Sequence, residues 1–158
     1  DEIWQPLIDH NSPFKAGHTL NANAVSCAGG LAVLDYLLEN RLVERSAEIG
    51  AYMLDQMKEK LLAHRIVGDV RGKGLMVGFE MVQDKATKEP FDPKLRLSSW
   101  LEKEAFERGV ITYPCTGSVD GWAGDMTLLA PPLTISKDQV DEVIRALDAS
   151  LSAMEAKL

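Results

Sequence analysis

The chain has 158 residues, 46% of them hydrophobic, a composition that supports a packed core and argues against global disorder. Its formal net charge of −7 argues against a protein that binds nucleic acid through the phosphates, because that function needs a basic face. No stretch approaches ~18 continuous apolar residues, so we expect neither a transmembrane helix nor a membrane partner.

Helices are predicted in the first forty residues. An apolar stripe in "DEIWQPLID" indicates a short helix, and a 3.6-residue period predicts a longer helix over residues 23–39, ended by Asn40. Gly29 and Gly30 each cost this helix about 1 kcal/mol relative to alanine, so we expect it to pack closely against another backbone. The chain starts at Asp1 without a methionine and offers no obvious cover for this small-residue face, which indicates a missing portion.

A second long helix is predicted over about residues 42–63, because apolar residues recur there with helical spacing. Strict alternation of apolar residues follows at residues 75–82 and predicts a strand with Leu75, Val77, Phe79 and Met81 on one face. Asp92 followed by proline is typical of a helix start, and this helix is predicted to run to about residue 108.

Two short strands are predicted at residues 110–113 and 126–130, separated by a glycine-rich loop. Ser136 and Gln139 have the spacing of a capping box, so a last helix is predicted from there to near the end of the chain. The order after residue 64 is β-α-β-β-α. It predicts a small sheet covered on one face by two helices.

Candidate site residues lie in "PFKAGHTLNANAVSCAGG", just before the helix predicted at residues 23–39. A hydroxyl such as that of Thr19, together with free backbone N–H groups at a helix N-terminus, suits an anion such as phosphate. The simpler interpretation is that Thr19, Asn21 or Asn23 caps the helix. Arg71 is a weak candidate for binding a substrate carboxylate, with a surface or interdomain ion pair as the simpler interpretation.

The cysteines and histidines form no recognisable metal motif. Cys27 and Cys115 follow no CxxC or zinc spacing, and His10, His18 and His64 are scattered. Two free thiols in a reducing cytoplasm are favoured over a single disulfide. We therefore expect a cytoplasmic protein without a metal site.

Four segments, collinear from about Phe14 to Leu151, carry a family resemblance: "GHTLNANAVSCAGGLAVLDYLLENRLVERSAEIGAYM", "VGDVRGKGLMVGFEMVQDKATKEPF", "ERGVITYP" and "GDMTLLAPPLTISKDQVDEVI". Together they resemble the C-terminal portion of class III aminotransferases of the ω-amino acid or amine–pyruvate type. These are pyridoxal-phosphate (PLP) enzymes of fold type I. The resemblance implies an α/β protein whose small α+β domain has an antiparallel-type sheet covered by helices. Residues 1–40 would end an incomplete large PLP-binding domain, and residues 41–158 would form the linking helix and the small domain.

The resemblance also implies a function: PLP-dependent transamination between an amine or amino acid donor and an oxo acid acceptor, carried out by a homodimer. The family's Schiff-base lysine, its pyridine-binding aspartate and its phosphate-binding loop are expected upstream of Asp1. No catalytic residue is therefore assigned here, and this segment alone is expected to be inactive. The threonine of the family's "GHT" segment donates to the PLP phosphate of the neighbouring subunit. It matches Thr19, flanked by Gly17 and His18, and these three are the expected cofactor-binding residues.

Two alternatives remain open. One is a stand-alone, non-catalytic module that oligomerises through the helical face around Ala24, Cys27, Ala28 and Leu31. The other is a different class III PLP enzyme, such as an aminomutase or a decarboxylase, because the reaction is chosen largely by residues outside this sequence.

Overall fold

The computed structural model describes residues 2–13, 15, 17, 19 and 21–158, and the chain divides into two compact units, residues 1–40 and residues 41–158. The first unit contains α1 (Gln5–Asp9) and α2 (Ala24–Glu39). The side chain of Asn23 accepts the backbone N–H of Ser26 and caps α2, and Asn40 follows its last residue. The helix predicted at residues 23–39 is thus confirmed, and none of its residues is buried.

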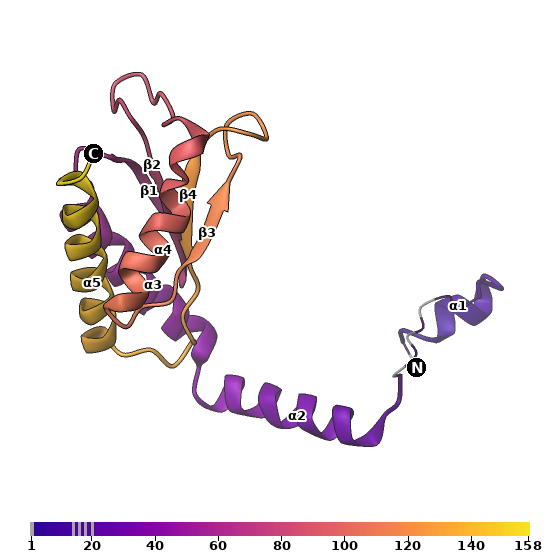
Figure 1. Cartoon of the computed structure of the whole chain (residues 1–158). Helices are drawn as coiled ribbons and strands as arrows, with labels where there is room; N and C mark the ends of the chain where they lie inside the picture. The colour runs from indigo at the N-terminus through magenta and orange to yellow at the C-terminus, as the bar shows by residue number, and fades with distance from the viewer. Residues whose placement is uncertain (1, 14, 16, 18, 20) are drawn as a thin grey trace. The chain divides into compact units, whose positions relative to one another are not determined.

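The second unit holds a four-stranded antiparallel sheet. Its strands lie in the order β1-β2-β4-β3, and all three neighbouring pairs are antiparallel. Figure 1 shows the succession of its elements, which are α3 (Leu42–Leu61), β1 (Val67–Lys73), β2 (Met76–Met81), the 3-10 turn η1 (Pro93–Leu95), α4 (Leu97–Glu107), β3 (Tyr113–Thr116), β4 (Asp125–Leu129) and α5 (Lys137–Glu155).

The core lies between the sheet and the helices of this unit. The helix α3 contacts β1 and β2, α4 contacts β3 and β4, and α5 contacts both α3 and α4 (Figure 1). Two covering helices were predicted after residue 64, and the structure corrects this: α3, which precedes that point, packs directly on the sheet. Its predicted apolar stripe is buried, namely Leu42, Ile49, Met53, Met57 and Leu61.

The strand β1 is the element that the sequence pattern missed. Its residues do not alternate in hydrophobicity, because Gly68 and Gly72 carry no side chain and a bulge interrupts the register between Val67 and Asp69. A Cβ at Gly72 would overlap the backbone of the neighbouring β2 residues. Glycine here permits the close approach of two strands, so backbone pairing forms a strand that periodicity cannot reveal.

Two other boundaries differ from prediction. The strand predicted at residues 110–113 lies instead at Tyr113–Thr116 and includes Pro114, a residue that sheets tolerate on edge strands such as β3. The helix predicted from residue 93 is split, because Arg96 adopts the left-handed conformation with φ 50° between η1 and α4. Among the described residues, every helix is too short or too polar to span a bilayer.

Candidate functional site

Two of the three expected phosphate-binding residues, Gly17 and Thr19, lie among the described residues of the first unit. Thr19 and Gly17 are both exposed, and a Cβ at Gly17 would meet no atom within 4 Å. His18 lies outside the described residues. The cap of α2 is supplied by Asn23, whose Oδ1 accepts the Ser26 N–H at 3.0 Å. Of the three residues considered as caps, Asn23 therefore takes this role.

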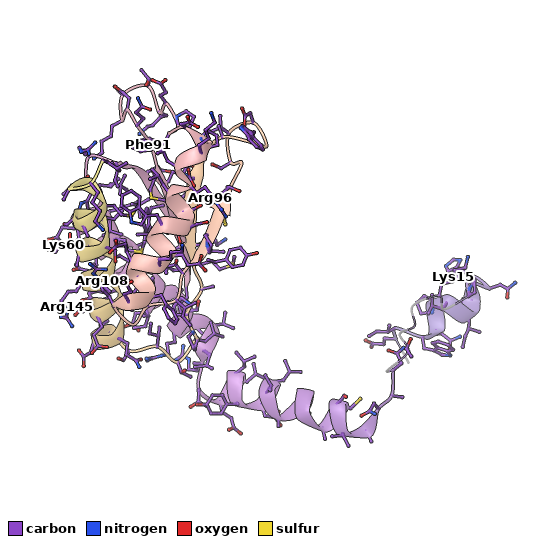
Figure 2. The ribbon with its side chains drawn as sticks, in the orientation of Figure 1. Lys15, Lys60, Phe91, Arg96, Arg108 and Arg145 are labelled. Carbon is purple, nitrogen blue, oxygen red and sulfur yellow. The ribbon has the colours of Figure 1, made fainter. Side chains whose placement is uncertain are left out.

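The residues present fit a partial contribution to a phosphate group. A threonine hydroxyl is a hydrogen-bond donor that phosphate oxygens accept, and Thr19 presents it on a solvent-facing turn four residues before the N-cap. Gly17 leaves the adjoining backbone open. One hydroxyl is not a complete anion cradle, so further donors must come from other residues. Lys15, labelled in Figure 2, is exposed in the same segment.

Arg71 lies in the second unit, on β1, between two carboxylates. Its Nη1 donates to Asp69 Oδ2 at 2.7 Å, and its Nη2 donates to Glu80 on the neighbouring strand. The hydrogen bond from Arg71 lowers the pKa of Asp69, and the bonds to Glu80 and Asp69 raise the pKa of Arg71. The guanidinium thus forms a surface ion-pair network whose side chains are 28% to 52% exposed.

The most strongly perturbed acid is one that the sequence did not single out. Glu104 on α4 receives hydrogen bonds from Lys157 at 3.1 Å, Arg108 at 2.9 Å and Trp100 at 3.2 Å. These bonds, that from Lys157 foremost, lower its pKa to about 2. The cluster ties α4 to the end of α5. Because its donors and acceptor satisfy one another, it is a structural ion-pair cluster rather than an acid–base site.

Two clefts in the second unit show no arrangement of side chains that indicates a catalytic site. The first, about 580 Å³, is lined by apolar residues such as Met53, Val110 and Leu129, and its Arg108 is already paired with Glu104. The second, about 640 Å³, lies at the start of α4, where the buried Asp125 accepts the Ser98 N–H at 2.9 Å. Within the described part of the chain, no three His, Cys, Asp or Glu side chains are grouped to hold a metal ion.

Comparison with known proteins adds a family relationship. The family model described as aminotransferase class-III matches residues 5–151. An uncharacterised aminotransferase of Schizosaccharomyces pombe is 42% identical over 140 residues, which make up 89% of this chain and 30% of that protein. A leucine/methionine racemase of Thermococcus litoralis is 31% identical over 149 residues, 94% of this chain and 31% of the racemase.

A solved structure gives the same result for the fold. An (S)-enantioselective omega-transaminase from Thermomicrobium roseum has a TM-score of 0.82 at 42% identity, over 97% of this chain and 32% of that one. The solved neighbours are transaminases of PLP fold type I, so the predicted fold class, including the small antiparallel sheet covered by helices, is confirmed. The chain spans about a third of the length of the relatives that it matches.

Proposed function

The chain belongs to the class-III aminotransferases, a family of PLP-dependent enzymes, and we propose that it forms part of a longer enzyme that transfers an amino group from an amine or amino acid to an oxo acid. The observation that carries the proposal is the continuous family match over residues 5–151, combined with coverage of only about a third of each relative. A chain of this extent supplies a portion of the enzyme, and we propose that it is inactive alone.

The two compact units support an assignment of the chain to parts of two domains. We assign residues 1–40 to the end of the large PLP-binding domain, and residues 41–158 to the linking helix α3 and the small domain. The division of the chain into two compact units between residues 40 and 41 supports this assignment. The helix α2 supports the first assignment: it is apolar yet has no buried residue, and helices that are apolar around their circumference are normally enclosed by a larger protein.

Thr19 is the residue of this chain to which we assign a direct role. Its hydroxyl would donate to the phosphate of the cofactor held by the other subunit of a homodimer, with Gly17 and His18 shaping the turn. PLP, when bound, supplies the electron sink for amino-group transfer. The contribution of Thr19 is binding and orientation. Arg71 would have to release Asp69 or Glu80 to hold a substrate carboxylate, so its role in substrate binding is secondary.

The proposal is tested first on the chain itself. We expect that incubation with PLP, borohydride reduction and peptide mass spectrometry will find no single lysine specifically modified, and that amine and oxo acid will not exchange an amino group. Specific modification of one lysine together with turnover would contradict the assignment of the catalytic lysine to another part of the enzyme. We further propose a cytoplasmic location, consistent with the free thiols of Cys27 and Cys115.

A second class III reaction is kept as an alternative because one relative is a leucine/methionine racemase. The longer enzyme that contains this chain separates the two reactions. A transaminase consumes an oxo acid and releases a new one, whereas a racemase inverts the α-carbon of one amino acid with no oxo acid required. Chiral chromatography of an amino acid, with and without added oxo acid, distinguishes them. A stand-alone oligomerisation module would instead self-associate and lack both activities.

A further inference from the structure

His64 lies between two carboxylates at the junction of α3 and β1. Its Nδ1 is 3.0 Å from Glu155 Oε2, and its Nε2 is 3.0 Å from Asp148 Oδ1. Both acids are on α5, 84 and 91 residues away in sequence, and their separation of seven residues places them on one face of the helix. The imidazole is only 9% exposed, so these two carboxylates are its main polar partners.

The two contacts require different protonation states of the ring. A neutral imidazole carries one N–H, and its other nitrogen is an acceptor. An acceptor nitrogen facing a carboxylate oxygen at 3.0 Å is repelled, because both atoms present lone pairs. Only the doubly protonated imidazolium donates to Asp148 and Glu155 together, and such charge-assisted hydrogen bonds are stronger than neutral ones.

The two acids are not equally constrained. Glu155 is 20% exposed, and its Oε1 also accepts the backbone N–H of Ile66 at 3.2 Å. Asp148 is 51% exposed and can turn towards water. When the ring is neutral, its remaining proton is therefore best placed towards Glu155, and the contact with Asp148 is the one released.

We propose that His64 is a protonation-dependent tether between the α3–β1 junction and α5. The charged ring is hydrogen-bonded to both carboxylates, and the neutral ring is released from Asp148. The tether lies in the second unit and is independent of any cofactor. Its consequence is that the last turns of α5 are held more firmly in mildly acidic than in mildly alkaline solution.

Charged groups around His64 oppose or favour the protonated form of its ring. Arg65 donates to the Glu155 backbone carbonyl, Lys85 donates to the Leu62 carbonyl near the same junction, and Lys60 and Arg145 line the groove that contains Asp148. These four cations oppose the charge on the ring, whereas the two carboxylates favour it.

Glu155 determines the low pH at which the tether is lost. Burial raises its pKa, but the hydrogen bonds from His64 and from the Ile66 N–H lower it by more, so the net shift is downward. An acid with a lowered pKa stabilises the fold above its unfolded pKa, and this contribution is lost as the pH falls through the folded pKa. The tether therefore fails below the ordinary glutamate range and again when the ring loses its second proton.

The test compares the full chain with His64→Gln in mildly acidic solution, at pH 5.5, and in mildly alkaline solution, at pH 8.5. We expect the variant to lower the folded-to-unfolded ratio in urea more at pH 5.5 than at pH 8.5, with the two effects differing on the order of five-fold. His10→Gln, at an exposed histidine, is the matched control and should show no such difference.

Asp148 is exposed, so Asp148→Asn should fold normally. In this background the effect of His64→Gln on the folded-to-unfolded ratio should become nearly the same at the two pH values. Nitrogen NMR of the imidazole gives a direct readout: both ring nitrogens of His64 should be protonated at pH 5.5 and one at pH 8.5. Equal effects of His64→Gln at the two pH values, or a singly protonated ring at pH 5.5, would overturn the proposal. If His64→Gln does not fold, the NMR measurement decides.

Discussion

Gly50 of α3 lies directly against Gly74 in the turn between β1 and β2. A Cβ placed on Gly50 would overlap the carbonyl group of Gly74, so no side chain separates these two backbones. Gly74 itself has φ 55°, a conformation that favours glycine. This contact determines how closely α3 approaches the sheet that it covers.

Gly50→Ala should therefore destabilise the chain. Alanine improves helix propensity by about 1 kcal/mol, but forcing a methyl group into a filled contact costs about 1–3 kcal/mol and the neighbouring backbone cannot move freely. We expect a lower midpoint in urea or thermal unfolding. Gly29→Ala in α2, where a Cβ meets nothing within 4 Å, is the control and should not lower the midpoint. Equal midpoints for Gly50→Ala and the wild type would show that the contact is looser than described.

Asp125→Ala should weaken the start of α4. The buried carboxylate of Asp125 accepts the Ser98 N–H from 27 residues away and so replaces a local N-cap, which Arg96 does not provide. Loss of a cap costs about 0.5–2 kcal/mol. We expect chemical denaturation to show a loss of this size in the free energy of unfolding. The protected amides of α4 should also exchange hydrogen faster in the variant than in the wild type. Lys103→Ala, on the exposed face of the same helix, should change stability by less than about 0.5 kcal/mol.

Glu104→Gln should reduce stability at neutral pH, and the difference from wild type should shrink in acid. The Glu104 pKa lies at about 2, below its ordinary value of 4.5, because Lys157, Arg108 and Trp100 donate to the carboxylate. A lowered pKa stabilises the fold above about 4.5, and the contribution falls as the pH approaches 2. Unfolding at pH 7, 5, 4 and 3 measures this. A pH-independent difference would contradict it, and the exposed Glu107→Gln serves as the control.

Thr19→Ala should weaken PLP retention in the longer, dimeric enzyme that we propose for this chain. A hydrogen bond to a charged phosphate contributes about 1.5–3 kcal/mol, so the dissociation constant of PLP should rise about tenfold or more. Thr19→Ser keeps the hydroxyl and should retain most of the affinity, and Asn21→Ala tests a neighbouring exposed side chain. The measurement is the absorbance of PLP released during dialysis. An unchanged constant in Thr19→Ala would remove Thr19 from the cofactor site.

The family relationship and much of the local structure could be predicted from the sequence. Periodicity located α2, α3 and α5, and the spacing of Ser136 and Gln139 predicted a capping box that the structure contains. Alternation located β2, whose inward residues are buried. The role of Thr19 and its neighbours stays a prediction, because the proposed phosphate site would need donors from residues beyond this chain.

Other features could be found only in the tertiary structure, because they depend on contacts between residues that are distant in the sequence. The strand β1 forms by backbone pairing with β2, where Gly72 allows the two strands to approach closely, and no side-chain pattern records that pairing. Asp125 caps a helix 27 residues away, and His64 meets its two carboxylates 84 and 91 residues away. Hydrophobic period and a local capping box such as that of Ser136 and Gln139 are properties of neighbouring residues and can be predicted from the sequence alone. Close backbone approach and the pairing of remote polar groups arise only when the chain is folded, because α3 and α4 pack on the sheet, α5 packs on both helices, and these contacts bring the groups together.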